Sequence, residues 1–325
     1  MSELHQLAQK LIQAQRILLF PHVNMDGDTF GSCVALCLAL RKQGKECQIL
    51  AEEEPPAYLS FLDGDYTVTG PGSMTEPDLC IALDCSDAGR LAGRRDAFVA
   101  GKETWSLDHH VTNQYFAQNN IVQTEAAATA EIVYELIRLL PIQLSKEIAE
   151  AIYTAIATDT GSFQYSNTTS KTHLIAAELF EAGIDHNQIS IQVYQNARYE
   201  KFLIASLIYG TTERICDGKV ALAFVTQEML RQTGASMEET EGMIESLRSI
   251  QGVEVAIFLK EYEKKVIKVS LRSKSYADVA VISAAYGGGG HVRAAGFSMD
   301  RPLQEVKELI LLEACRQIKA YGQEG

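Results

Sequence analysis

Short apolar runs alternate with segments of helical periodicity in the first half of the chain, and this alternation is what most limits the fold. We predict strands at 16–20, 47–51, 79–83 and 104–107, and a helix over 31–42. The run at 79–83 is apolar at every position, as in a strand buried on both faces. The alternation predicts a doubly wound α/β domain with a mainly parallel sheet.

The second half of the chain begins with helical patterns and then changes character. A hairpin is predicted around Asp217-Gly218, because this dipeptide favours a tight turn between two strand-like segments. We predict an α/β domain over 1–188, a helical linker over 189–210 and a smaller α+β domain over 211–325. The segments behind this division are helices at 129–140, 145–157, 171–182, much of 187–209, 237–250 and 303–321, and strands at 212–216, 219–225, 253–259 and 265–271.

The net charge of −13 and the hydropathy exclude several classes of function. No apolar run reaches the length of a membrane span, so no membrane is expected as a partner. A protein that binds long nucleic acid usually carries a basic stripe, and this chain has only short basic clusters. Two of these, Arg94-Arg95 and Lys264-Lys265, are predicted to be solvated. A nucleic-acid substrate should therefore be small.

The seven cysteines show no CxxC pair. Cys33 and Cys37 are four residues apart within a predicted helix, which is typical of small apolar core residues. No disulfide framework is expected. The N-terminal sequence also lacks the basic and apolar regions of a secretory signal. Together these features predict a protein of the reducing cytoplasm.

Acidic and imidazole side chains follow the predicted strands and end one predicted helix. Any one of these groups could be a solvated turn or a helix cap. Their combination indicates more, because a doubly wound domain brings the carboxyl ends of its strands together. Carboxylates gathered there need a cation to offset their repulsion. The residues concerned are His22, Asp26 and Asp28, then Asp84, then Asp108, His109 and His110, and last Asp159.

Oxygen and imidazole ligands without cysteine favour a hard or borderline ion such as Mn²⁺ over zinc held by thiolates. Two such ions roughly 3.5–4 Å apart can clamp the attacking and leaving oxygens of a phosphoryl displacement. The residues therefore predict a site for divalent metal ions, of a kind that could serve phosphoryl displacement.

Four segments resemble, in order and spacing, the motifs of DHH phosphoesterases. They are HVNMDGDTFGS, the acid of LDCSD, the DHH triplet and the acid of ATDTGSF. Met25 departs from the pattern, since many members have proline there, but it is not a ligand position. The resemblance covers nearly the whole chain and is greatest to the bifunctional oligoribonucleases and pAp phosphatases.

This resemblance implies roles for the motif residues. His22, Asp26 and Asp84 would hold one ion, and Asp28, Asp84, His109 and Asp159 the other, with Asp84 bridging. His110 would contact the phosphate or the leaving oxygen as a catalytic residue. Asp108 would orient His109.

A second motif lies in the predicted C-terminal domain. The glycine run at 287–290 can expose backbone N–H groups to an anion, and His291 and Arg272 could add donors. Alone, such a run is as easily a tight turn. It resembles the DHH-associated C-terminal domain, which in that family lies across a cleft from the metals and binds the nucleotide end of the substrate. The implied substrate-binding residues are Arg272, Ser273, Gly288, Gly289, Gly290 and His291.

The leading hypothesis is hydrolysis of very short RNA to mononucleotides and of pAp to AMP. The alternative is a phosphodiesterase for cyclic or linear dinucleotides such as c-di-AMP or pApA. A pyrophosphatase is disfavoured by the GGGGH segment, a long-chain exonuclease by the acidic charge, and a catalytically dead regulator by the complete set of ligands. The direction of RNA degradation, the native metal and a homodimeric state are left open.

Overall fold

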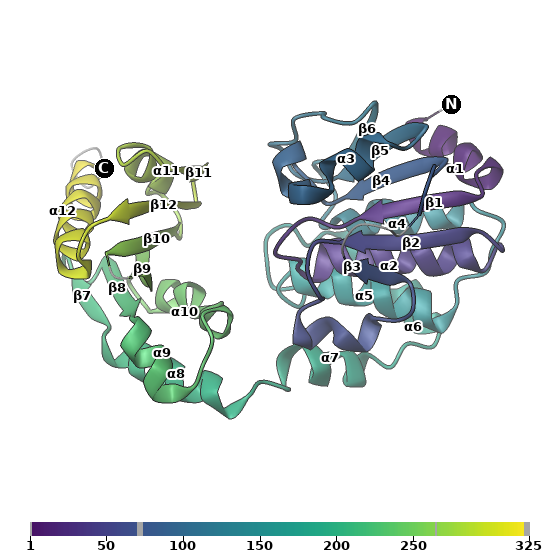
Figure 1. Cartoon of the computed structure of the whole chain (residues 1–325). Coiled ribbons are helices and arrows are strands. Elements are labelled where there is room, and N and C mark those ends of the chain that lie inside the picture. Colours follow the sequence, from purple (N-terminus) through teal and green to yellow (C-terminus); the bar gives the residue numbers. More distant parts are fainter. Residues whose placement is uncertain (1, 70–73, 264, 322–325) are drawn as a thin grey trace. The chain divides into compact units, whose positions relative to one another are not determined.

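The computed structural model describes residues 2–69, 74–263 and 265–321, which form two compact units, 1–196 and 197–325. The boundary falls inside the segment 189–210 that the sequence assigns to a linker. Figure 1 shows a sheet with helices in each unit. Within the described residues, none of the helices is long and apolar enough to cross a membrane.

Unit 1 is built on a six-stranded sheet in the order β3-β2-β1-β4-β5-β6, with every neighbouring pair parallel. The chain fills one side of the sheet and then the other, so the strand order reverses between β1 and β4. The predicted doubly wound domain is confirmed. The strands are β1 (Arg16–Phe20), β2 (Glu46–Ala51), β3 (Thr67–Thr69), β4 (Leu79–Leu83), β5 (Glu103–Asp108) and β6 (Asn119–Val122).

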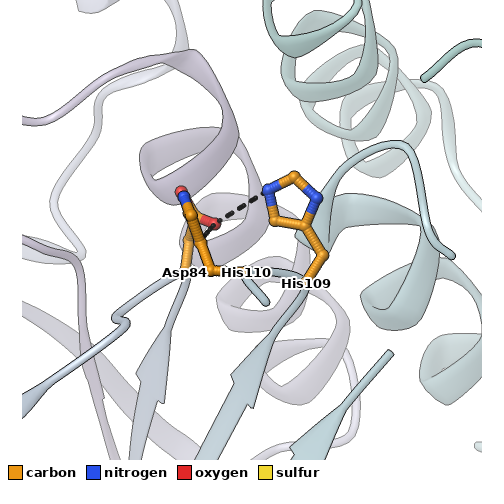
Figure 2. A group of neighbouring side chains, drawn as sticks. All are labelled: Asp84, His109 and His110. Atoms are coloured by element: carbon orange, nitrogen blue, oxygen red, sulfur yellow. Dashed lines mark ion pairs between the residues drawn. The ribbon is translucent and has the colours of Figure 1, made fainter. Parts of the chain in front are cut away.

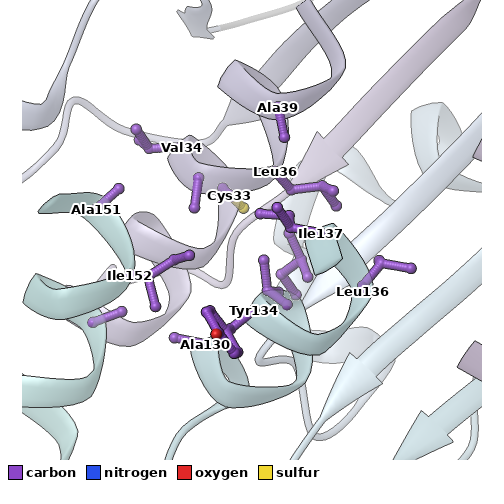
Figure 3. Close-up of a cluster of buried hydrophobic side chains, with 14 of the residues drawn as sticks. Cys33, Val34, Leu36, Ala39, Ala130, Tyr134, Leu136, Ile137, Ala151 and Ile152 are labelled. Carbon is purple, nitrogen blue, oxygen red and sulfur yellow. The ribbon is translucent and has the colours of Figure 1, made fainter. Parts of the chain in front are cut away.

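Both faces of this sheet are covered, which explains its continuous apolar runs. Ile81 of β4 belongs to the larger core with α2 and α4, whereas Cys80 and Ala82 pack with Phe98 of α3 on the other face. Figure 3 shows α2, α4 and α5 meeting through small and branched side chains. The helices are α1 (Glu3–Gln13), α2 (Gly27–Arg41), α3 (Arg95–Val99), α4 (Thr129–Arg138), α5 (Lys146–Asp159), α6 (Ser170–Glu181) and α7 (His186–Tyr194), with 3₁₀ turns η1 (Ala57–Leu62) and η2 (Ala88–Arg94).

Unit 2 contains a second six-stranded sheet in the order β11-β12-β10-β9-β8-β7, antiparallel except between β8 and β9. One face packs on α11 and α12, and part of the other packs on α8, α9 and α10. The strands are β7 (Glu213–Ile215), β8 (Val220–Val225), β9 (Val255–Glu263), β10 (Val266–Ser273), β11 (Gly289–His291) and β12 (Ala294–Asp300). The helices are α8 (Tyr199–Gly210), α9 (Gln227–Thr233), η3 (Glu238–Thr240), α10 (Met243–Ser249), α11 (Val279–Ala284) and α12 (Leu303–Tyr321).

Several local predictions were wrong. Helix α2 begins at Gly27 rather than residue 31, because the Asp26 side chain caps it. The helix predicted over 237–250 is divided by Gly242, whose φ of 86° is left-handed. The glycine run expected to be a loop enters a strand pair, β11 with β12. In contrast, the helical pattern predicted over much of 187–209 is confirmed, as two helices, α7 and α8.

Two predictions from composition also need correction. Arg94 is buried rather than solvated, because its guanidinium donates to the carbonyls of Pro21 and Leu50 at 2.9 and 2.8 Å. Lys264 lies outside the described residues. Cys216 and Cys315 form a disulfide, although none was expected. The two residues are 99 positions apart in the sequence, so their Cα–Cα distance of 5.8 Å could not be foreseen. The other five cysteines are free and buried.

Candidate metal centre

The candidate site lies where the strand order of unit 1 reverses. His22 follows β1 by two residues, and Asp84 follows β4 directly. Asp108 ends the neighbouring strand β5, and His109 and His110 come after it. Ligands of open α/β sheets bind at this carboxyl edge, beside the switch in strand order. The parallel register of β1, β4 and β5 therefore brings three separate motifs to one place.

The loop after β1 is fixed by its own polar groups. Asp26 accepts hydrogen bonds from the backbone N–H groups of Asp28 and Thr29, both at 3.1 Å, and so starts α2. Gly27 is needed here, since a Cβ atom would lie 2.1 Å from Oγ1 of Thr158. This close approach sets the start of α2 against the end of α5, which carries Asp159.

Helix α4 begins against the buried carboxylates. Its own N-cap residue, Ala128, has no side-chain hydrogen bond to give. Asp28 accepts instead from the backbone N–H groups of Thr129 and Ala130, at 2.6 and 3.0 Å, and Asp84 accepts from the Thr129 hydroxyl at 2.8 Å. The partial positive charge of a helix N-terminus favours acids in this position. Both carboxylates are thereby held in fixed orientations.

Asp84 also has an unusual backbone. Its φ of 62° is left-handed, which costs a residue other than glycine of order 1–3 kcal/mol. The side chain is almost fully buried. The strain is maintained because the Asp84 N–H donates to the Leu107 carbonyl at 2.9 Å and its carboxylate holds Thr129. This backbone turns the carboxylate out of the strand direction and into the site.

The predicted ligands meet in three overlapping groups. Within each group, one ligand atom from every residue lies within 4.8 Å of the others. Asp84 belongs to two groups and His109 to two, so the groups form one continuous cluster. The groups are His22, Asp26 and Asp84; Asp28, His109 and Asp159; and Asp84, His109 and His110.

His22 and His109 both direct the Nε2 atom of the ring at carboxylates. Nδ1 of His22 lies 2.8 Å from the Val23 carbonyl, and Nδ1 of His109 lies 3.1 Å from the Ala126 carbonyl. A carbonyl can only accept, so each Nδ1 must carry a proton. In the neutral ring, the Nε2 lone pair then faces carboxylate oxygens, at 3.4–3.5 Å for His22 and 3.6–4.0 Å for His109. A cation between these atoms removes the repulsion, as in histidine metal sites.

The pKa shifts point the same way. Burial, with the nearby carboxylates of Asp84 and Asp159, raises the pKa of Asp28 well above its ordinary value. Burial and the charges of Asp84 and Asp26 raise the pKa of Asp159 to about 6. Burial lowers the pKa of His22, but its contacts with Asp26 and Asp84 outweigh this and raise it to about 9. The cluster thus favours added positive charge, which divalent ions would supply.

His110 stands at the exposed side of this cluster, and Figure 2 shows it beside Asp84 and His109. Its Nδ1 donates to Asp108 at 2.7 Å, and this bond raises the pKa of His110 to about 9. Asp108 is fully buried and also accepts from Asn113 at 2.6 Å. The expectation that Asp108 orients the His109 side chain was wrong. The Asp108 carboxylate accepts a hydrogen bond from the ring of His110, whereas the ring of His109 donates to the Ala126 carbonyl.

Comparison with known proteins decides the family. The N-terminal domain of the DHH family matches residues 16–156, and the DHHA1 domain matches residues 217–320. A Thermus thermophilus protein named bifunctional oligoribonuclease and PAP phosphatase NrnA is 32% identical over 308 residues, which cover 92% of this chain and 90% of the relative. The chain belongs to the DHH family.

A solved structure and a second named relative are also similar to this DHH protein over nearly its whole length. A crystal structure described as an exopolyphosphatase-related protein from Bacteroides fragilis superposes with a TM-score of 0.91 at 26% identity, and the match covers 98% of this chain and 97% of that one. The cyclic-di-AMP phosphodiesterase PdeA of Listeria monocytogenes is 23% identical, and the match covers 96% of this chain but 48% of PdeA.

The predicted substrate-binding residues of the DHHA1 domain separate into three sets. Arg272, Gly289 and Gly290 line a cavity within unit 2. His291 is exposed and is not among the residues that line this cavity. Ser273 is buried and donates to the Val292 carbonyl at 3.3 Å, and Gly288 packs against β12 with no room for a Cβ atom. These last two residues support the β11–β12 pair.

Sequence reasoning missed the groups that hold the candidate ligands in place. Thr129, the Ala126 carbonyl and Asn113 carry no metal chemistry of their own and so give no signal in a motif search. Thr129 had one indirect signal, since it starts a helix without a capping side chain. Lys260 and Lys268 of unit 2, which line the cavity with Arg272, were also missed.

Proposed function

We propose that the chain is a two-metal phosphoesterase that hydrolyses very short RNA to mononucleotides and dephosphorylates pAp to AMP. The observation that carries this proposal is the clustering of the candidate ligands. Asp84 and His109 each belong to two of the three ligand groups and so join them into one cluster. Membership of the DHH family and the named activity of the Thermus relative support the choice of substrates.

We assign His22, Asp26 and Asp84 to one ion and Asp28, Asp84, His109 and Asp159 to the other. Mn²⁺ suits this donor set, which combines carboxylates and imidazoles without thiolates. The ions would supply the Lewis acidity that activates water and neutralises charge on the phosphate. Backbone donors from α4 hold Asp28 and the Thr129 hydroxyl holds Asp84, so both ligands keep their orientation before any ion binds.

His110 is the residue we assign to proton transfer. Its Nδ1 is bonded to Asp108, which leaves Nε2 free to reach a substrate oxygen, and the ring is partly exposed. The hydrogen bond to the buried carboxylate of Asp108 favours the protonated form of the imidazole. In this form it can donate a proton to the leaving oxygen of a phosphoester. Asp108 acts through His110 as a positioning residue.

We propose that unit 2 binds the end of the substrate that is not being cleaved. Arg272 and the backbone of Gly289 and Gly290 line its cavity, and guanidinium groups suit phosphate. The net charge of −13 opposes the binding of long RNA, so the substrates should be short. We place the enzyme in the reducing cytoplasm, which suits the five free, buried cysteines, and the Cys216–Cys315 bond is the exception among the seven.

The test is a product time course on dinucleotides, longer RNA, pAp and c-di-AMP, run side by side with Mn²⁺ and with chelator. We expect mononucleotides from the short RNAs, AMP from pAp, slow turnover of long RNA and no activity with chelator. The alternative, a c-di-AMP phosphodiesterase, is favoured only by the weaker similarity to PdeA. Faster turnover of c-di-AMP than of pAp and dinucleotides would replace our assignment by that one.

A further inference from the structure

Strand β10 of unit 2 has one apolar face and one cationic face. Ile267, Val269 and Leu271 point into the core with α11 and α12 and are fully buried. The alternate residues Lys268, Ser270 and Arg272 lie on the opposite face and line the cavity. The helices on that face bury β8 and β9 side chains such as Ala223 and Phe258, but leave β10 accessible. This part of the sheet is therefore available to a ligand.

Two lysines face each other across the strands in this cavity. Lys260 of β9 and Lys268 of β10 are direct register partners in an antiparallel pair. Like charges in this position repel and destabilise a sheet. Arg272 lies on the same face of β10, so three cationic side chains line one cavity of about 370 Å³. They do so in a chain whose net charge is −13.

The counterions in the cavity only partly neutralise these cations. Lys260 is 5% exposed, yet its carboxylate partner Glu241 has a side chain that is 76% exposed. Arg272 pairs with Glu245 at 3.3 Å. Among the residues that the structure describes, Lys268 has no carboxylate within ion-pair distance. The carboxylates of Glu241, between η3 and α10, and of Glu245, on α10, can move aside for a stronger anion.

One side of the cavity, next to Arg272 in the same sheet, is made of small residues. Gly289 and Gly290 of β11 and Ala294, Ala295 and Gly296 of β12 contribute backbone and methyl groups. A wall without long side chains gives a flat surface that a planar ring can approach. The cavity thus combines cationic side chains with a flat surface. The cations suit the phosphate of a nucleotide, and the flat surface suits its base.

We propose that Lys260 and Lys268 bind a terminal phosphomonoester of the substrate, distinct from the phosphoester that is cleaved. The ligand class is a nucleotide with a 5′-phosphate, and the lysine pair makes the enzyme favour such substrates over those that end in a 5′-hydroxyl. This inference rests on the proposed function, because it assigns the uncleaved end of the same substrates to the cavity. It adds a phosphate-binding pair to Arg272, which sequence motifs had indicated.

The decisive experiment measures binding without catalysis. The full-length protein is kept in chelator and titrated with 5′-AMP and with adenosine, for wild type, Lys268→Met and Lys260→Met. Methionine keeps the length of the side chain and removes the charge. Lys219→Met is the matched control, since Lys219 is exposed at the β7–β8 hairpin of the same unit and does not line the cavity.

Each cavity variant should bind 5′-AMP about tenfold more weakly, as expected for loss of one charge-assisted contact. Adenosine binding should not change, and Lys219→Met should behave as wild type. Lys268 is exposed, so its variant folds whether or not Lys260 tolerates replacement. Unchanged affinity for 5′-AMP in Lys268→Met would overturn the inference, and so would equal losses for 5′-AMP and adenosine.

Turnover gives a separate comparison. In wild type, kcat/KM should be higher for pAp than for 3′-AMP, which lacks the 5′-phosphate, and Lys268→Met should reduce that ratio about tenfold. Lysine-dependent binding of 5′-AMP by a protein that hydrolyses neither compound would support the cavity and refute the proposed function. If pAp is hydrolysed but the lysine variants leave the ratio of kcat/KM for pAp and 3′-AMP unchanged, the proposed function stands and the role of the lysines is refuted.

Discussion

The two units gather opposite charges at their sheets. In unit 1, carboxylates crowd the carboxyl edge of a parallel sheet and meet the N-terminus of α4. In unit 2, lysine and arginine side chains occupy one face of a mainly antiparallel sheet, beside glycine and alanine. The difference indicates different ligands. The acidic site suits cations, and the cationic site suits an anion.

The two sites also differ in how their charged groups are held. Asp28 and Asp84 are buried and bonded to backbone and hydroxyl donors of α4, so they cannot move without disturbing the helix. In unit 2, Lys260 is held by Glu241, whose carboxylate is largely in solvent. Fixed ligands suit ions that stay bound, whereas exchangeable counterions suit a substrate that must leave. The predictions below test this contrast.

The largest effect is expected at Asp84. Asp84→Asn removes a charge shared by two of the ligand groups, so metal content and turnover of a chromogenic phosphodiester should both fall. A loss of roughly a thousandfold in kcat/KM corresponds to the several kcal/mol that metal ions contribute. Asp87→Asn is the control, because Asp87 follows the same strand but only caps η2. A near-normal rate with two ions bound would remove Asp84 from the site.

A smaller effect is expected at Asp108, whose partner is His110. Asp108→Asn should lower kcat about 10–100-fold and leave metal content unchanged. The pKa of His110 is raised to about 9 first by its bond to Asp108. The protonated imidazole is lost above that pKa, so the alkaline fall in rate should move to lower pH in the variant. Loss of metal from the Asp108→Asn variant would instead indicate that Asp108 orients His109, as the resemblance implied.

Arg272 tests the role of unit 2. Arg272→Ala should reduce kcat/KM for pApA about tenfold, because positioning of the uncleaved end is weakened. A small chromogenic phosphodiester should be affected much less, since it has no second phosphate. Arg248→Ala, on α10 of the same unit and outside the cavity lining, is the control. Equal losses on both substrates would assign Arg272 to stability instead.

The smallest effect concerns the metal-free protein. The pKa of Asp159 is raised from 3.8 to about 6, so the folded state holds this proton more tightly than the unfolded state does. The charged form therefore costs stability as pH rises through that interval. In chelator, Asp159→Asn should be more stable than wild type near pH 7 by about 1 kcal/mol, and the difference should vanish near pH 4. Chemical denaturation measures the free energy of unfolding of both proteins. A difference that does not change between pH 7 and pH 4 would contradict the raised pKa of Asp159.

The gathering of these acidic and imidazole side chains could be predicted from sequence because backbone geometry determines where they lie. A buried strand followed by an acid places that acid at the sheet edge, and this applies to Asp84 and Asp108 alike. The partners of these residues could not be predicted. Which carbonyl meets Nδ1 of His109, and which ring Asp108 binds, depend on loop paths of a few ångströms. Sequence spacing does not determine distances on that scale.

In unit 2, the hairpin at Asp217-Gly218 and the long helix α12 followed from local signals. The cavity did not, because it depends on register. A bulge between Val266 and Ile267 shifts β10 against β9 and sets Lys268 opposite Lys260. A slip of one residue would place Lys268 on the apolar face. Sequence patterns show which residues alternate, but not which partners they face.

The disulfide gives unit 2 a property that its sheet and helices do not. Cys216 lies where β7 turns toward β8 and Cys315 lies on α12, so the bond closes a covalent loop around most of the unit. A protease that cut once between these residues would leave two fragments still joined through sulfur. They would migrate as one chain until a reductant was added. Limited proteolysis followed by electrophoresis with and without reductant would therefore report whether the Cys216–Cys315 bond is formed in the isolated protein.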